Sequence, residues 1–429
     1  MGKDGGGPSK IRWAVLVCTA YALMGWVLSY DSIGALTVSL QEDRGLNGYQ
    51  IGLMYSMYGV PGLVWLPLAG LIVDRIGTTR SLAVFGLVTT LGTATVALEP
   101  LWLMLAGRGL VGLGGETIAL AARKATGLWF PREEERALAL SVVITLPWTG
   151  SILAFLCLPS IARHIGASGC LWLTAGIMAS GGAVFLGLQA FEQFGLIQPH
   201  SSSRPMSTIT TTAPREEDDQ QHVVKWEDVK RFPPSFWLLA SWQCCVNGTL
   251  WPFLAMSSEF YHDKFDYSAE QAGFLGAAFA AIAIASSPLF GSVTGRYANQ
   301  IGLGIAASAI VAFSYLLLGF TDVSPIYGTV LLSLTLGMSI PVFFSSIPLI
   351  VDPKATGTAL GISATIANLS FVSMPFAFGY FYHITSSFHL SLGFFSALGL
   401  VGILIMLVIK FRYPLIRFDN PNLDPSSSL

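Results

Sequence analysis

A glutamate stands inside a long apolar stretch of this chain, in the segment GLVGLGGETIALAARK. In a helix with about 100° per residue, Arg108, Gly112, Glu116 and Arg123 fall within an arc of about 80°. A charge at the centre of a bilayer costs on the order of 2.5–3.5 kcal/mol, so such groups face protein or a water-filled cavity. Glu116 is therefore a candidate partner for an ammonium group. Alternatively, Glu116 and Arg108 pair with other helices and hold the protein together.

The composition places these charges in a membrane protein. The chain is 53% hydrophobic and 11% charged, whereas about a quarter of the residues are charged in an ordinary soluble domain. The formal net charge of −2 gives no indication of a nucleic-acid partner. We see no Walker-type glycine loop, no nucleophile with a paired base and no His/Cys cluster with metal-ligand spacing. The sequence therefore predicts no enzyme, no cofactor and no metal site.

Twelve stretches reach the roughly 20 apolar residues that a helix needs to cross a bilayer. We expect them at residues 13–40, 48–73, 81–98, 101–129, 137–160, 169–190, 236–260, 269–294, 301–320, 326–351, 357–382 and 388–410. The predicted fold class is an all-α membrane protein with six-helix bundles at 1–190 and 236–410. A cytoplasmic linker, first Ser/Thr-rich and then acidic, joins them at 191–235, and a cytoplasmic tail follows at 411–429.

The distribution of Lys and Arg predicts the orientation, because these residues collect in cytoplasmic loops. With a cytoplasmic N-terminus, nineteen of the 23 basic residues fall on the cytoplasmic side. Three fall on the other side, Arg44, Arg163 and Lys264, and Arg108 lies inside the membrane. We therefore expect both termini and the linker to face the cytoplasm.

The two halves of the sequence repeat each other. Gln50 and Gly52 stand at the start of the second span, and Gln271 and Gly273 stand at the start of the eighth. The two pairs are separated by an offset of about 221 residues. The same offset relates the glycine and arginine of GLIVDRIGTTR to those of GSVTGRYANQ. A duplicated six-helix unit with a binding site between parallel halves is typical of rocking-type secondary transporters.

The loop after the second span, GLIVDRIGTTR, resembles the signature cytoplasmic loop of the major facilitator superfamily. Gly70 is expected to permit close helix approach, and Gly77 a tight turn. Asp74 is expected to cap a neighbouring helix or to pair with an Arg, so that with Arg75 and Arg80 it forms a conformational latch. The alternative is that the loop only turns the chain.

Asp31 is a second carboxylate inside an apolar span. Its depth in the first span matches that of Arg108 in the fourth, so an ion pair between these residues would compensate both charges. The alternative is that Asp31 caps a break in the helix around Gly34.

Three motifs resemble the lysosomal dipeptide-transporter branch of the superfamily, often called major facilitator superfamily domain-containing protein 1. The first is Asp31 with Leu36 at the end of the first span. The second is Tyr-x-x-Tyr-x-x-Pro in the second span, with Tyr55, Tyr58 and Pro61. The third is Gly-Gly-Glu-Thr in the fourth span, followed by Trp-Phe, with Gly114, Gly115, Glu116, Thr117, Trp129 and Phe130. The resemblance implies that Glu116 receives the amino end of a dipeptide. It also implies a lysosomal or other acidic-organelle membrane and an accessory membrane glycoprotein; the plasma membrane is the alternative.

The fifth span departs from that branch. The branch has an Arg there for the peptide carboxylate, whereas SVVITLPWTGSIL has Pro147 and Trp148 and no basic residue. Arg123 or Arg108 could replace it from the fourth span. Alternatively the substrate is an amine or another cation, and Trp148 offers a cation-π face.

In the superfamily the first, fourth, seventh and tenth helices line the central path. By that analogy Asn247 and Trp251 of the seventh span and Phe343 of the tenth join the candidate site. Ordinary packing or interhelix hydrogen bonding is the alternative for each of them.

The sequence thus predicts a secondary-active or facilitative transporter that moves a small polar organic solute by alternating access. A dipeptide or an amino-acid-like cation is the expected solute, the lipid bilayer is the surrounding partner, and protons are a further candidate ligand. Two alternatives stay open: a proton-coupled sugar or organic-anion carrier, and a non-transporting receptor or scaffold on the same fold.

Overall fold

The computed structural model describes residues 9–130, 133–195, 232–297, 300–351 and 356–413, and regular structure in these ranges is helical. The helices of the first half are α1 Ser9–Ala35, α2 Thr37–Arg44, α3 Gly48–Ile76, α4 Thr78–Val96, α5 Leu101–Trp129, α6 Glu133–Thr145, η1 Leu146–Trp148 and α7 Thr149–Gln193. Those of the second half are α9 Pro234–Phe265, α10 Ala269–Tyr297, α11 Gln300–Phe320, α12 Pro325–Ile350, α13 Thr356–Thr385 and α14 Phe388–Arg412. Most of the predicted linker and tail lies outside the described residues.

Every predicted span coincides with helix. By length and composition alone, 8 described helices can cross a membrane, or 9 if the two parts of α3 are one span. Helix α7 contains the end of the predicted fifth span and the whole of the sixth. Helices α4 and α9 are less apolar, because α4 has several threonines and α9 has polar side chains such as Asn247 and Glu259, which are buried in the protein.

Helix breaks divide two predicted spans. The first span is interrupted at Leu36, between α1 and α2. In the fifth, the turn of η1 with Pro147 separates α6 from α7, as expected of a residue that lacks an N–H and disrupts the preceding turn. The predicted fifth and sixth spans meet at Gly166, whose φ of 70° only glycine adopts readily. The N–H of Ala167 donates to Asp43 Oδ2 over 2.7 Å and so satisfies the helix start after this joint.

The repeat in the sequence is a repeat in structure. In α3, Asn47 and Gln50 form a capping box, in which each side chain accepts from the backbone N–H of the other. Ser268 and Gln271 do the same at the start of α10, over 2.9 and 3.3 Å. These are the positions that the sequence offset equates.

A second pair of equivalent contacts lies near these caps. The Arg44 guanidinium donates to the carbonyls of Ala97 and Leu98, where α4 ends, over 2.9 and 3.1 Å. Lys264 Nζ donates to Gly319 and Thr321, where α11 ends, over 2.9 and 3.0 Å. Basic side chains at helix C-termini satisfy free carbonyls and oppose the helix dipole. Partial burial lowers the pKa of both side chains.

The two halves meet along glycines. A Cβ on Gly52 of α3 would lie 2.6 Å from the carbonyl oxygen of Pro375 on α13, and one on Gly379 of α13 would lie 2.8 Å from that of Gly48. At the equivalent of Gly52, Gly273 of α10 packs on the carbonyl of Phe155 in α7. Small residues permit this approach of backbones.

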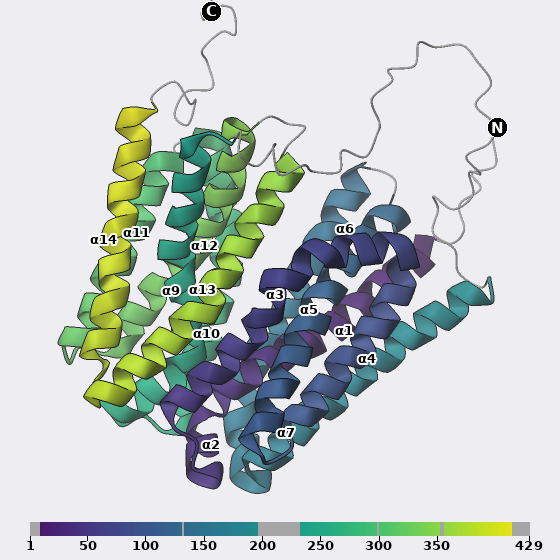
Figure 1. Ribbon diagram of the computed structural model, residues 1–429, viewed down its shortest axis with the longest axis horizontal. Coiled ribbons are helices and arrows are strands. Elements are labelled where there is room, and N and C mark those ends of the chain that lie inside the picture. Colours follow the sequence, from purple (N-terminus) through teal and green to yellow (C-terminus); the bar gives the residue numbers. More distant parts are fainter. Residues whose placement is uncertain (1–8, 131–132, 196–231, 298–299, 352–355, 414–429) are drawn as a thin grey trace, which may run out of the picture.

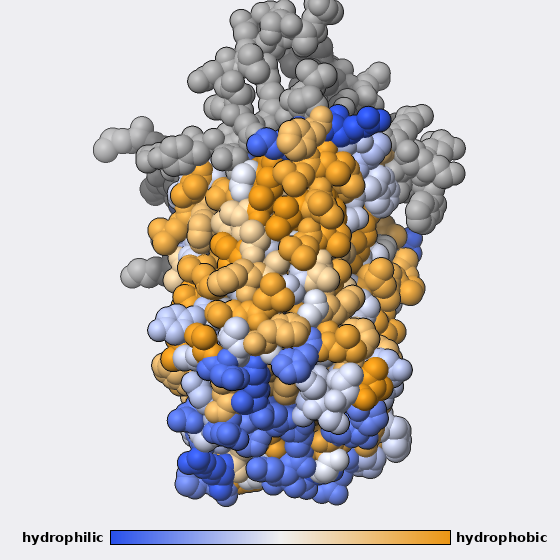
Figure 2. Space-filling model, turned by 90° about the vertical axis from the view of Figure 1, so that its left-hand side faces the viewer, coloured by the Kyte–Doolittle hydropathy of each residue, from blue (hydrophilic) through white to orange (hydrophobic). Residues whose placement is uncertain are grey.

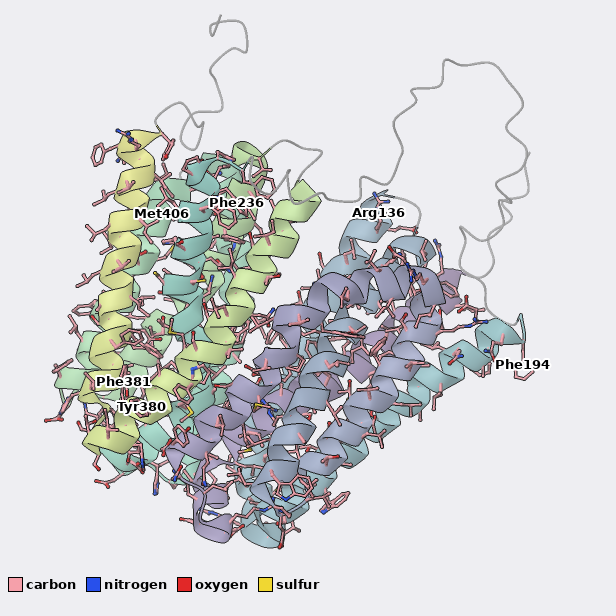
Figure 3. All side chains as sticks on the ribbon, in the orientation of Figure 1. Arg136, Phe194, Phe236, Tyr380, Phe381 and Met406 are labelled. Carbon is pink, nitrogen blue, oxygen red and sulfur yellow. The ribbon has the colours of Figure 1, made fainter. Side chains whose placement is uncertain are left out.

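The halves converge at one end of the molecule. We call this the α2 end; it holds α2 and the turns at residues 45–47, 266–268 and 321–324. Figure 1 shows the two groups of helices meeting at this end and diverging toward the opposite end, where α1 begins and α14 finishes. Tyr380 and Phe381 lie near the α2 end, and Arg136 lies at the opposite end (Figure 3).

The side of the molecule is apolar. Figure 2 shows a broad hydrophobic band over the face that contains α14, with hydrophilic residues gathered toward the α2 end. Large exposed side chains of this half include Phe313, Leu316, Leu400 and Leu404. An exposed apolar surface of this kind suits contact with lipid chains.

Candidate functional site

The glycines of α5 bring four helices together around Glu116. A Cβ on Gly112 would overlap the carbonyl oxygen of Tyr58 on α3, and one on Gly115 would overlap the indole nitrogen of Trp26 on α1. Gly114 packs in the same way on α4, with the carbonyl oxygen of Phe85 at 2.8 Å from its Cβ position. The glycines therefore serve close packing, which positions the neighbouring glutamate.

The Glu116 side chain lies among these helices and bonds to α3. Its Oε1 accepts a hydrogen bond from the Tyr58 hydroxyl over 3.0 Å. The residue is partly exposed, and within the described ranges it forms no ion pair. Arg123 is exposed on the same helix and interacts electrostatically with it. Glu116 is thus an accessible carboxylate with spare acceptor capacity.

Arg108, by contrast, is fully enclosed. Its guanidinium donates to the carbonyls of Met54, Ser29 and Tyr30 over 3.2–3.3 Å. Three tyrosine rings surround it at 5.0–5.3 Å from their centroids, those of Tyr30, Tyr55 and Tyr58. Cation-π contacts and carbonyl bonds together compensate a buried guanidinium. Arg108 joins α5 to α1 and α3.

The predicted Asp31–Arg108 ion pair is not formed. Both residues are buried and interact electrostatically. However, Asp31 Oδ2 and Arg108 Nη2 have no hydrogen-bond partner among the described residues. The same is true of Ser151 Oγ on α7. The alternative, a cap at Gly34, is not seen either. The Gly34 N–H donates to the Tyr55 hydroxyl over 2.8 Å, and the helix breaks at Leu36.

Two tryptophans face each other between the halves. Trp148 of η1 and Trp251 of α9 are stacked, with centroids 4.7 Å apart and ring planes at 26°. Both are partly exposed. The structure therefore brings together two predicted site residues from opposite halves.

Two other predicted residues of the second half are buried. The Asn247 amide donates to Gln243 Oε1 over 2.7 Å and accepts from Ser339 Oγ over 2.6 Å. Phe343 is buried and packs edge-on against Phe344. These contacts agree with the packing alternative for both residues.

Tyr30 and Trp26 were missed by the sequence analysis. The Tyr30 ring centroid lies 4.6 Å from that of Tyr58. The Trp26 Nε1 is buried against Gly115 and has no hydrogen-bond partner in the part of the chain that the structure describes. The sequence signal that could have identified them is the spacing of four residues between Trp26 and Tyr30. This spacing places both side chains on one face of the helix that carries Asp31.

The residues of the predicted latch make some of the expected contacts. Asp74 forms an ion pair with Lys124 of α5, where an Arg was expected. Gly77 has a φ of 89° and makes the turn between α3 and α4, as predicted. The prediction for Gly70 is wrong: a Cβ there would meet no atom within 4 Å, so Gly70 permits no close approach in this conformation.

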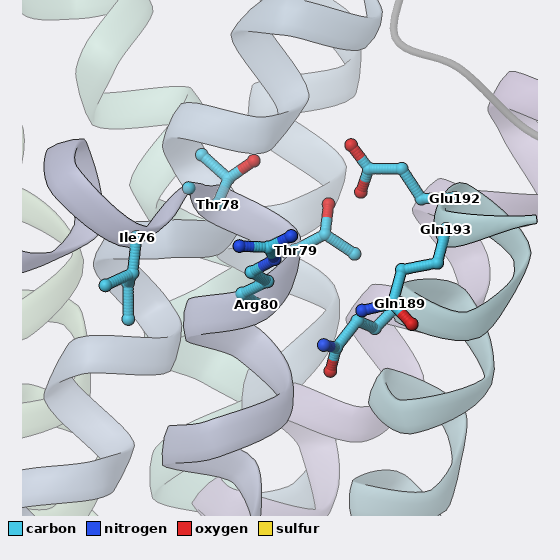
Figure 4. Close-up of a pocket in the computed structure, with 8 residues that line it drawn as sticks. Ile76, Thr78, Thr79, Arg80, Gln189, Glu192 and Gln193 are labelled. Carbon is cyan, nitrogen blue, oxygen red and sulfur yellow. The ribbon is translucent and has the colours of Figure 1, made fainter. Parts of the chain in front are cut away.

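Arg80 lines a surface pocket beside this turn (Figure 4). Both Arg75 and Arg80 are exposed. The opposite wall comes from the end of α7, with Gln189, Glu192 and Gln193. The pocket is lined by residues of the α3–α4 turn and of α7, and it shares no residue with the site around Glu116.

Comparison with known proteins identifies the family. The sequence model of the Major Facilitator Superfamily matches residues 15–375. The human lysosomal dipeptide transporter MFSD1 is 25% identical over 373 residues, 84% of this chain and 78% of the human protein. The probable sulfoacetate transporter SauU of Cupriavidus necator is 24% identical, over 96% of this chain and 97% of that protein.

A solved structure shows the same fold. The peptide transporter POT in complex with sulfate has a TM-score of 0.74 at 14% identity, over 98% of this chain and 97% of that one. The family match covers most of the chain, and the helices agree with the predicted all-α membrane fold. The chain therefore belongs to the major facilitator superfamily of membrane transporters.

Proposed function

We propose that this transporter moves a small solute with a protonated amino group, and that Glu116 binds that group. The observation that supports this is the difference in exposure among the three charged residues inside the first half. Arg108 is enclosed by carbonyls and rings, and Asp31 is buried, whereas Glu116 is partly exposed and has one hydrogen bond. A carboxylate in a medium of low dielectric constant is a strong partner for an ammonium group.

The orientation supports alternating access. We place the end opposite α2 in the cytoplasm, because nineteen of the 23 basic residues fall on that side. In this orientation both termini and the linker are cytoplasmic. The halves meet at the α2 end (Figure 1), so the conformation is closed toward the outer compartment. Rocking of the halves would then expose Glu116 to each side in turn.

A dipeptide or an amino-acid-like cation fits this site best. Glu116 takes the amino group, and the Trp148–Trp251 pair adds aromatic faces for a cation. Arg123 is an exposed basic residue on α5 and, unlike the neighbouring Lys124, forms no ion pair within the described residues, so it is our candidate for a substrate carboxylate. Human MFSD1 is a lysosomal dipeptide transporter by name. On this basis we propose an acidic-organelle membrane, with the plasma membrane as the alternative.

The remaining predicted residues take supporting roles in this proposal. Asp31, Arg108, Tyr55 and Tyr58 hold Glu116 and its helix in place, and Asn247 and Phe343 shape the second half. The latch residues stabilise the cytoplasmic end of the first half. Protons as a ligand of Glu116 and an accessory glycoprotein on the outer face are part of the same proposal.

The test is uptake by purified protein in proteoliposomes. Glu116→Gln keeps the shape of the side chain and removes its charge. A hydrogen bond to a charged group contributes about 1.5–3 kcal/mol, so we expect KM for a dipeptide to rise about 10- to 100-fold. Glu192→Gln, at the surface pocket away from the site, is the matched control and should leave KM unchanged. Unchanged KM in Glu116→Gln would exclude the binding role.

An organic-anion carrier is the second candidate. It is favoured by Arg108 Nη2, which has no hydrogen-bond partner among the described residues, and by the exposed Arg123. SauU is a probable sulfoacetate transporter by name. Competition separates the two: small amines should inhibit uptake at the proposed site, whereas small carboxylates or sulfonates should inhibit an anion carrier. Binding without flux would indicate a receptor or scaffold.

A further inference from the structure

A carboxyl group is buried where the two halves meet at the α2 end. Glu259 lies near the end of α9 and is 1% exposed. Gln41 of α2 donates to its Oε1 over 2.5 Å. A Cβ on Gly48 of α3 would lie 2.5 and 2.8 Å from the two carboxyl oxygens. The side chain thus belongs to the second half and is enclosed by α2 and α3 of the first.

No cation compensates this group within the described residues. Two basic residues stand close to Glu259 and Gln41 in the sequence, and both donate to backbone carbonyls. Lys264 donates to carbonyls at the end of α11, and Arg44 donates to carbonyls at the end of α4. Glu259 Oε2 has no hydrogen-bond partner among the described residues.

The other titratable groups nearby are acidic, hydrogen-bonded elsewhere or, in the case of His383, exposed. Asp263 lies one turn further along α9 and accepts from the Tyr382 hydroxyl of α13 over 2.5 Å. A like charge four residues away on a helix is unfavourable. His262 Nδ1 bonds to the carbonyl of Tyr267, and His383 of α13 lines a small pocket with Gly48. On α2, Glu42 is exposed and Asp43 accepts from Ala167.

We propose that Glu259 is a proton-binding site that controls contact between the halves at the α2 end. Burial of an ionised carboxylate without a paired cation is far less favourable than burial of the neutral acid. The closed arrangement therefore binds a proton at Glu259. When the halves separate, water reaches the carboxyl group and the proton dissociates.

The direction of the pH effect follows from linkage. A proton that binds more tightly to the closed arrangement stabilises that arrangement, so acid favours closure of the α2 end and alkali favours its opening. A difference of one pK unit between the two arrangements changes their ratio by up to about tenfold. This inference does not depend on which solute is carried.

Hydrogen exchange tests the proposal on the full chain in lipid nanodiscs. Amide exchange would be measured at one mildly acidic and one mildly alkaline pH and corrected for intrinsic exchange rates. The informative peptides cover residues 37–51 and 255–272, on the two sides of the contact. Peptides from α14 report whether the fold is intact. In the unmodified protein we expect up to about tenfold faster exchange of the contact peptides at alkaline pH.

Three variants give distinct expectations. Glu259→Gln mimics the protonated, neutral form of Glu259 at every pH. Its contact peptides should therefore exchange their amide hydrogens slowly at both pH values. Asp263→Asn, the matched control, removes a neighbouring acid and should keep the pH effect. Gly48→Ala places a methyl group against the carboxyl oxygens and should speed exchange at acidic pH.

The result that overturns the proposal is equally clear. The proposal fails if the contact peptides of the unmodified protein exchange equally fast at both pH values. It also fails if folded Glu259→Gln still exchanges faster at alkaline pH. If Glu259→Gln does not fold, the unmodified protein and Gly48→Ala still decide. No transport is measured, so a wrong substrate assignment leaves this test unaffected.

Discussion

The Tyr58 hydroxyl lies 3.0 Å from Glu116 Oε1, and the ring of the same tyrosine lies 5.3 Å from the Arg108 guanidinium. One side chain of α3 therefore contacts two charged groups of α5, Glu116 and Arg108. It separates an accessible carboxylate from an enclosed cation, which prevents the two from neutralising each other. This arrangement leaves the negative charge available to a ligand.

Tyr58→Phe should weaken substrate binding with little loss of stability. The variant keeps the ring against Arg108 and removes the bond that orients Glu116. Water can replace part of that bond, because Glu116 is partly exposed. We expect KM for uptake to rise about three- to tenfold. The control is Tyr21→Phe, which removes a 2.8 Å bond to Ser180; an equal effect in both variants would contradict a specific role.

Arg108→Lys should destabilise the protein although it keeps the charge. An ammonium cannot reproduce the three carbonyl bonds and the stacking of a planar guanidinium. Loss of one hydrogen bond to a charged group costs roughly 1.5–3 kcal/mol. Thermal unfolding in detergent should show a clearly lower Tm. Arg412→Lys, at an exposed position on α14, should leave Tm unchanged. A Tm of Arg108→Lys equal to that of the unmodified protein would show that the enclosure is not needed.

Two glycines of α5 should respond in opposite ways to replacement by alanine. At Gly112 a methyl group meets the backbone carbonyl of Tyr58, whereas at Gly127 it meets no atom within 4 Å. We expect Gly112→Ala to lose about 1–3 kcal/mol through overpacking. Gly127→Ala should be neutral or gain up to about 1 kcal/mol through helix propensity. Denaturation of both variants under one condition measures the difference; similar values would refute the packing role of Gly112.

The sequence predicts the helices and the repeat well, because both are local signals. Apolar length identifies the spans, and the offset of about 221 residues equates Gln50 with Gln271, whose capping bonds are observed. Gly77 is also predictable, since a tight turn between two helices requires a residue that tolerates positive φ.

Contacts that depend on rotation about helix axes are not predictable in this way. Asp31 and Arg108 have matching depths, yet three tyrosine rings enclose the guanidinium, and no ion pair forms. Gly70 and Gly112 look alike in the sequence, but one faces open space and the other a carbonyl. Glu259 stands at the edge of a predicted span, where exposure is the simplest expectation. Gln41 and Gly48 of the other half enclose it.

The glycine contacts between α3 and α13 have a mechanical consequence. Along this line a main chain touches a main chain, at Gly52 with Pro375 and at Gly48 with Gly379. At these points backbone meets backbone without an intervening side chain, and the rings of Tyr49 on α3 and Phe376 on α13 pack edge-on beside them. Separation of the halves here hydrates a narrow strip of backbone and parts one pair of rings, which suits an interface that must open and close repeatedly.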